Sequence, residues 1–185
     1  MLRHVPNFLT ALRLAAAPMT AGLLAAGHFN AAFGMFAFAG LSDAADGYLA
    51  KRFGLTTRLG RFLDPAADKA LMLALFVTLS VLADVPVWLA AAIVGRDALI
   101  VMGLLIAVAA RAPIAVRPLF IGKLATALQV VYIAWHLAGL AFGLPSVAPA
   151  DAYVLAAVTF ASVVVYGGVW VKAMRMAWYP DSPRI

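Results

Sequence analysis

The chain contains no cysteine and no glutamate, and only 12% of its 185 residues are charged. Without cysteine, neither a disulfide framework nor a thiolate metal site can form. Without glutamate, all eight acidic residues are aspartates. Hydrophobic residues make up 65% of the chain and the mean hydropathy is +0.99. Soluble domains carry about 25% charged residues, so this composition indicates a membrane protein.

Long apolar runs with short breaks between them predict six membrane-spanning helices. One span needs roughly 20 apolar residues, and the chain has room for about six with short loops. The predicted spans are residues 7–27, 29–53, 57–83, 85–110, 117–143 and 150–178. The sequence therefore predicts an all-α integral membrane protein, with residues 1–185 forming one membrane domain.

The distribution of basic residues predicts the orientation of these spans. Lys and Arg gather at both termini and in the segments 51–61 and 111–123, whereas the gaps near residues 28, 84 and 147 contain none. By the positive-inside rule, both termini and the 51–61 turn face the cytoplasm. The basic residues do not cluster on a soluble face, so no nucleic-acid partner is expected.

The first apolar run follows Arg3 and His4 and could be mistaken for a signal peptide. Arg13 interrupts the run and further spans follow, so we interpret it as a retained first span. The opening residues do not resemble an Arg- and Ser-rich transit peptide. This favours a bacterial protein of the cell (inner) membrane.

Four aspartates lie close together in an otherwise apolar stretch. Asp43 and Asp46 are three residues apart on the second predicted span, and Asp64 and Asp68 are four apart on the third. Each spacing places its pair on one helix face. Two neighbouring helices joined by a short turn would bring all four carboxylates together, much as bundle metal sites are built.

A cluster of acids at membrane depth needs positive charge beside it, since each carboxylate costs roughly 2.5–3.5 kcal/mol there. All-oxygen ligands suit Mg²⁺ or Mn²⁺ better than zinc or copper. Two such ions would neutralise the acids and leave positions open for a diphosphate. Gly47 and Gly60 remove side chains where a backbone or ligand must approach closely.

Two other interpretations of the acids stay open. A buried aspartate can be a neutral hydrogen-bonding group, or it can pair with Lys69 or Arg96, but this explains four aspartates in register poorly. Intramembrane acids also occur in cation transporters and channels, near the midplane and in two related halves. Here the acids lie against one cytoplasmic turn and have no counterpart in the second half of the chain.

The acids also belong to a longer pattern. It reads Asp43-x-x-Asp46-Gly47-x-x-Ala50, a basic residue, eight residues, then Gly60-x-x-x-Asp64-x-x-x-Asp68. This pattern resembles the signature of the CDP-alcohol phosphotransferase family, whose bacterial members often open with Pro-Asn-x-x-Thr-x-x-Arg, as in Pro6 to Arg13. One position departs from it: the residue after Ala50 is usually Arg, and here it is Lys51, which cannot meet a phosphate as a two-pronged fork.

The resemblance implies a metal-dependent phosphatidyltransferase that acts as a homodimer, with a polar cavity open to the cytoplasm. It implies that Asp43, Asp46, Asp64 and Asp68 bind two Mg²⁺ or Mn²⁺ ions around the diphosphate of CDP-diacylglycerol, and that Asp68 is the general base. The nucleotide-binding residues implied in the same way are Gly47, Ala50, Lys51, Arg58 and Gly60.

Three further basic residues are candidates for binding the acceptor. Arg96 lies at membrane depth, where a cation needs an anion beside it; this could be substrate or its neighbour Asp97. Arg117 and Lys123 lie at the start of the fifth span, where the positive-inside rule explains them equally well. His136 is expected to be a helix-packing residue.

Two subfamilies compete for the acceptor. Phosphatidylglycerophosphate synthases, which use glycerol 3-phosphate, typically show Arg-Glu in the fourth span and another Arg one or two turns later. CMP-forming cardiolipin synthases show Arg-Asp there, as Arg96-Asp97 does, and a Lys-x-x-Thr-Ala-x-Gln run, as residues 123–129 do. The resemblance therefore favours phosphatidylglycerol as acceptor and cardiolipin as product.

Overall fold

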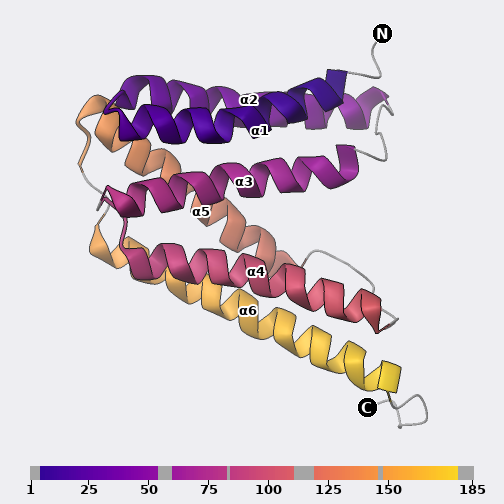
Figure 1. Cartoon of the computed structure of the whole chain (residues 1–185). Helices are drawn as coiled ribbons and strands as arrows, with labels where there is room; N and C mark the ends of the chain where they lie inside the picture. The colour runs from indigo at the N-terminus through magenta and orange to yellow at the C-terminus, as the bar shows by residue number, and fades with distance from the viewer. Residues whose placement is uncertain (1–4, 54–59, 83, 111–118, 146–147, 179–185) are drawn as a thin grey trace. The chain divides into compact units, whose positions relative to one another are not determined.

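The computed structural model describes the backbone of residues 5–53, 60–82, 84–110, 119–145 and 148–178 (Figure 1). Within these ranges, the side chains of residues 5–11, 44–53, 60–66, 108, 173 and 175–178 lie outside the description. The described residues form six helices and no strand: α1 (Val5–Ala25), α2 (Phe29–Phe53), α3 (Gly60–Val81), α4 (Val87–Ala109), α5 (Phe120–Phe142) and α6 (Pro149–Trp178). This confirms the predicted all-α class, and each predicted span coincides with one helix to within three residues at either end.

Glycines end two of the helices. Gly27 follows α1 with a φ of 75°, a conformation that glycine adopts without steric cost. Its N–H donates to the Leu24 carbonyl at 3.0 Å, and the His28 N–H donates to the Leu23 carbonyl at 2.9 Å. This is the Schellman pattern, which satisfies the last carbonyls of a helix. Gly143, with a φ of 68°, ends α5 in the simpler αL motif, in which its N–H donates to the Gly139 carbonyl at 2.9 Å.

The chain divides into two compact units. The first contains residues 1–87 and 130–147, and the second contains residues 88–129 and 148–185. Helix α5 begins in the second unit and ends in the first. That residues 1–185 form one membrane domain stays a prediction.

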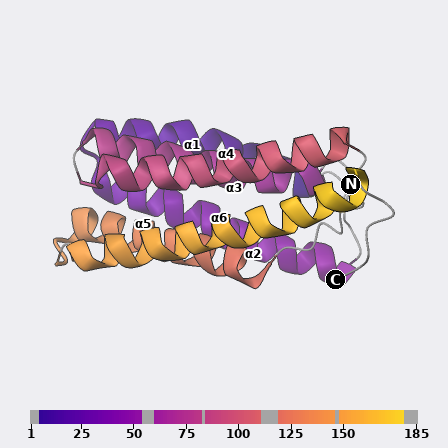
Figure 2. The same ribbon diagram turned by 90° about the horizontal axis from the view of Figure 1, so that it is seen from below.

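In the first unit, α1 packs against both α2 and α3. Helices α1 and α3 run alongside each other in both views (Figures 1 and 2). The second half of α5 adds Tyr132, stacked on Phe76 of α3 with ring centroids 6.2 Å apart. His136 Nε2 lies 2.7 Å from the carbonyl oxygen of Asp84, which matches the packing role expected for this histidine.

In the second unit, α4 and α6 run in the same direction. Trp88 near the start of α4 stacks on Tyr153 near the start of α6, with ring centroids 5.3 Å apart. Further along, the Trp170 ring of α6 lies directly over Gly103 of α4. The missing side chain at Gly103 therefore allows this close approach.

Replacing Gly103 with Val is expected to destabilise the second unit. Even a Cβ atom at this position would lie 2.5 Å from the Trp170 ring, far inside van der Waals contact. Overpacking of this kind costs about 1–3 kcal/mol. Gly95→Val on the same helix is the matched control, since no atom lies within 4 Å of its added Cβ. Thermal unfolding in detergent should show a lower Tm for Gly103→Val than for Gly95→Val; equal values would contradict the contact.

Three of the helices are long and apolar enough to cross a membrane, counting only the described residues. They cover Val87–Ala107, Phe120–Phe142 and Pro149–Lys172. Together with the composition, they indicate a membrane protein. Large apolar side chains are also exposed along them, among them Leu105 at 60% and Phe160 at 69%. In water such surface is unfavourable, whereas lipid tails would cover it.

Candidate active site

Arg13 lies on the buried face of α1. The residues three, four, seven and eleven positions further on are Ala16, Ala17, Thr20 and Leu24, and all are buried. This spacing places them on one face of the helix. Three of the four are small, so neighbouring helices can approach closely there. Arg13 itself is only 3% exposed.

Asp43 and Asp68 continue the buried faces of the two neighbouring helices. On α2, Ala39 is buried four residues before Asp43. On α3, Leu71 and Leu75 are buried three and seven residues after Asp68. The same apolar faces that pack α1 against α2 and α3 therefore also bring the three charged side chains together.

The guanidinium of Arg13 bridges the two carboxylates. Its Nη2 lies 2.7 Å from Asp43 Oδ1, and its Nη1 donates to Asp68 Oδ1 at 2.9 Å. The Arg13 side chain is 2% exposed, whereas the side chains of Asp43 and Asp68 are 43% and 48% exposed. The Arg13 guanidinium is therefore buried, whereas the two carboxylates that it contacts remain accessible.

This arrangement fits a divalent cation of the magnesium or manganese kind. The two carboxylates come from different helices, meet on one guanidinium and offer only oxygen atoms, which are the ligands that these ions prefer. Within the described side chains, no group of three or more potential ligands comes together. Asp46 and Asp64 lie on α2 and α3 by sequence, but their side chains are outside the description.

The predicted nucleotide-binding residues fall on the same two helices or between them. Gly47, Ala50 and Lys51 lie on α2, and Gly60 begins α3, with side chains outside the described set. Arg58 lies outside the described residues altogether. Their roles stay predictions.

Of the predicted acceptor-binding residues, Arg96 is the best defined. It is 5% exposed, and its Nη1 lies 2.6 Å from Asp97 Oδ1. Its Nε donates to Ser162 Oγ on α6 at 3.1 Å, and its Nη2 donates to the Gly122 carbonyl on α5 at 3.3 Å. Arg96 therefore ties three helices of the second unit together, and the ion pair with Asp97 that the sequence allowed is present.

The other two acceptor candidates are less informative. Lys123 is exposed on the first turn of α5, and its backbone N–H donates to the Leu119 carbonyl at 3.2 Å. Arg117 lies outside the described residues. Binding of the acceptor by Arg96, Arg117 and Lys123 stays a prediction.

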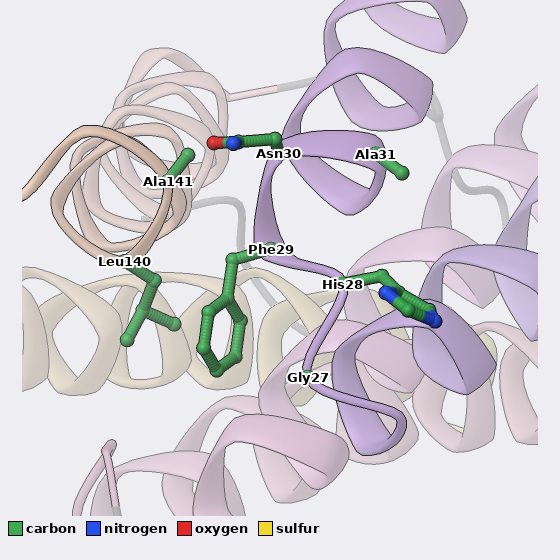
Figure 3. A pocket seen from close by; sticks show the side chains of 7 residues that line it. All are labelled: Gly27, His28, Phe29, Asn30, Ala31, Leu140 and Ala141. Carbon is green, nitrogen blue, oxygen red and sulfur yellow. The ribbon is translucent and has the colours of Figure 1, made fainter.

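A pocket of about 330 Å³ lies in the first unit, between the α1–α2 turn and the end of α5. Its lining residues are Gly27, His28, Phe29, Asn30, Ala31, Leu140 and Ala141. Figure 3 shows Phe29 beside Leu140, and Asn30 pointing toward Ala141. Asp43 is about 20 Å further along α2 at 1.5 Å per residue, so this pocket is separate from the carboxylates. Its lining contains no carboxylate and does not suit a metal-bound diphosphate.

Sequence comparison identifies the family. The profile of the CDP-alcohol phosphatidyltransferase family matches residues 3–166. The chain belongs to this family. The match includes Arg13 and all four motif aspartates, so the bridge between α1, α2 and α3 lies within the family's shared region.

Individual relatives are similar over shorter stretches. The CMP-forming cardiolipin synthase of Rattus norvegicus is 32% identical over 154 residues, covering 75% of this chain and 51% of that protein. A probable phosphatidylglycerophosphate synthase of Mycobacterium tuberculosis is 37% identical over 102 residues, covering 52% of this chain and 49% of that protein. A Schizosaccharomyces pombe protein described as a cardiolipin synthase (CMP-forming) and mitochondrial hydrolase fusion is 44% identical over 97 residues, covering 52% of this chain and 16% of that protein. The chain thus spans about half the length, or less, of the curated relatives it matches.

Sequence reasoning missed the partner of the carboxylates. In the sequence, Arg13 is a charge within the first apolar run and part of the N-terminal motif, and Lys69 and Arg96 are the candidate counter-ions. A buried arginine in an apolar run needs an anion beside it, and this signal could have linked it to the aspartates.

Proposed function

We propose that the protein transfers a phosphatidyl group from CDP-diacylglycerol to an alcohol, with release of CMP. The observation that carries the proposal is the convergence of Asp43 and Asp68 from separate helices, within a chain of the CDP-alcohol phosphatidyltransferase family. The acceptor we favour is phosphatidylglycerol, with cardiolipin as product. The CMP-forming cardiolipin synthase relative and the Arg96-Asp97 pair support this choice.

In the proposed reaction, the acceptor hydroxyl oxygen attacks the phosphorus that bears the diacylglycerol. The bond from that phosphorus to the oxygen of the CMP phosphate breaks, and CMP leaves with the electron pair. Asp68 accepts the hydroxyl proton, for which it has an accessible carboxylate. The two divalent ions, held by Asp43, Asp46, Asp64 and Asp68, would offset negative charge on the diphosphate. The remaining task of the protein is to position the reactants.

The residues around the carboxylates have matching roles in this proposal. Gly47, Ala50 and Gly60 allow the cytidine to approach the backbone of α2 and α3, and Lys51 and Arg58 meet its phosphates. Arg96, Arg117 and Lys123 bind the acceptor. The enzyme has six spans with both termini and the site facing the cytoplasm, lies in a bacterial inner membrane and forms a homodimer.

The choice of acceptor is testable with purified protein. Given CDP-diacylglycerol, Mg²⁺ and phosphatidylglycerol, the protein is expected to form cardiolipin and release CMP in equal amounts. EDTA should stop the reaction, and added Mg²⁺ or Mn²⁺ should restore it. Product analysis by mass spectrometry and CMP release are the measurements.

Glycerol 3-phosphate provides the second arm of this experiment. The relative described as a probable phosphatidylglycerophosphate synthase makes it the alternative acceptor. Turnover with glycerol 3-phosphate and none with phosphatidylglycerol would replace cardiolipin synthesis by phosphatidylglycerophosphate synthesis. If the protein released no CMP with either acceptor, the proposed transferase activity itself would be wrong.

A further inference from the structure

The proposed chemistry does not use the contact that Arg13 makes with Asp43 and Asp68, the first and last aspartates of the motif. Nη1 and Nη2 of one guanidinium each engage a different carboxylate, at 2.9 and 2.7 Å. The three side chains come from three helices. Both carboxylates are close to half exposed while the guanidinium is almost fully buried. Both carboxylates therefore keep accessible surface in addition to the contact with Arg13.

A guanidinium is well suited to this geometry. It is planar and always charged, and its N–H groups point in fixed directions. When two of its nitrogens hold two carboxylates, the positions of those carboxylates relative to each other are restricted. A lysine ammonium carries the same charge but acts as a single point and cannot impose this geometry.

We propose that Arg13 is a positioning residue, which holds Asp43 and Asp68 in the orientation that receives the divalent ions and stays in place when the ions bind. This inference rests on the proposed function, because it takes the two carboxylates as metal ligands. Carboxylate ligands are commonly oriented by a second layer of hydrogen-bond donors, and mutation of such donors typically costs about 10–100-fold in metal affinity or activity.

The opposite role would be that Arg13 occupies the place of a metal ion and leaves when the ion arrives. Burial argues against this. The guanidinium lies on the apolar face of α1 that also carries Ala16, Ala17 and Thr20. Moving away from the carboxylates would break two short charge-assisted contacts made by an almost fully buried guanidinium, which is costly at membrane depth. Ions can instead approach from the exposed side of the carboxylates.

Manganese binding by the donor-free protein tests the proposal. We expect Arg13→Lys to weaken Mn²⁺ binding at least about tenfold. The measurement is a titration in detergent in which free Mn²⁺ is quantified by electron paramagnetic resonance. This substitution keeps the positive charge, so a change in affinity reports the lost geometry. A merely structural role would lower the Tm and leave the affinity of the folded protein unchanged.

Thr20→Val is the matched control. Thr20 is buried on the same face of α1 as Arg13, and its hydroxyl donates to the Ala16 carbonyl at 2.7 Å. Its substitution alters this buried face and should leave the Mn²⁺ affinity at the wild-type value. Equal affinity in wild type and Arg13→Lys would overturn the proposal, and so would tighter binding by Arg13→Lys. If the wild type itself does not bind Mn²⁺, it is the proposed function that fails.

A second measurement keeps Arg13 intact and covers the case in which Arg13→Lys does not fold. The chain has no cysteine, so Met19→Cys on α1 and Leu73→Cys on α3 introduce the sole labelling sites. Both positions are exposed, at 54% and 46%. The distance between spin labels there should be the same with and without Mg²⁺. A shift on addition of Mg²⁺ would mean that the ion releases Arg13, and it would overturn the proposal.

Discussion

Replacing Asp68 with Asn is expected to abolish phosphatidyl transfer while largely sparing donor binding. Asn cannot accept the hydroxyl proton, and loss of a general base typically costs 10²–10⁴-fold, so we expect a fall in kcat of about 10³-fold. The Asn side-chain oxygen can still accept the bond that Arg13 Nη1 donates at 2.9 Å. It can also remain a neutral oxygen ligand. The packing of α1 against α3 should therefore survive.

Two assays separate these effects. CMP release measures turnover, and calorimetry with CDP-diacylglycerol and Mg²⁺ in mixed micelles measures donor binding. Asp84→Asn is the matched control: Asp84 lies in the α3–α4 turn, outside the motif, and we expect it to retain turnover. If Asp68→Asn loses donor binding as completely as turnover, Asp68 is a metal ligand and not the base.

Replacing Arg96 with Met is expected to destabilise the protein strongly. The substitution removes an ion pair at 2.6 Å and two hydrogen bonds that join α4 to α5 and α6. Breaking a buried pair by removing one partner costs about 3–5 kcal/mol. Asp97 is 25% exposed, so water offsets part of this and we expect about 3 kcal/mol. For a chain of this size, that corresponds to a Tm lower by roughly 10 °C.

Thermal unfolding of purified Arg96→Met in detergent is the measurement. Arg96→Lys should be intermediate, because Lys can keep the ion pair with Asp97 but cannot also reach Ser162 and Gly122 in the same geometry. A normal Tm combined with a raised KM for the acceptor would show that Arg96 serves substrate binding alone. A low Tm with an unchanged KM would show a structural role alone.

Local sequence patterns determine much of the molecule. The apolar runs are long enough to specify each helix, and glycine at position 27 supplies the conformation that ends α1. Spacings of three and four residues place acids on one helix face, so the convergence of Asp43 and Asp68 from neighbouring helices could be predicted from the sequence alone. The family motif identifies the same residues, because it lies within a short stretch of chain.

The contacts made by buried charges were decided only by the tertiary structure. Arg13 meets Asp68 across 55 residues, and Arg96 meets Ser162 across 66. Helical periodicity says which face of a helix a residue occupies, but it does not say which other helix covers that face. The sequence therefore determines six helices, the acidic motif and the need of each buried arginine for an anion. Packing of small residues around Ala16 and Ala17 then selects Asp43 and Asp68 as the partners of Arg13, because only helices that approach closely can place both carboxylates on one guanidinium.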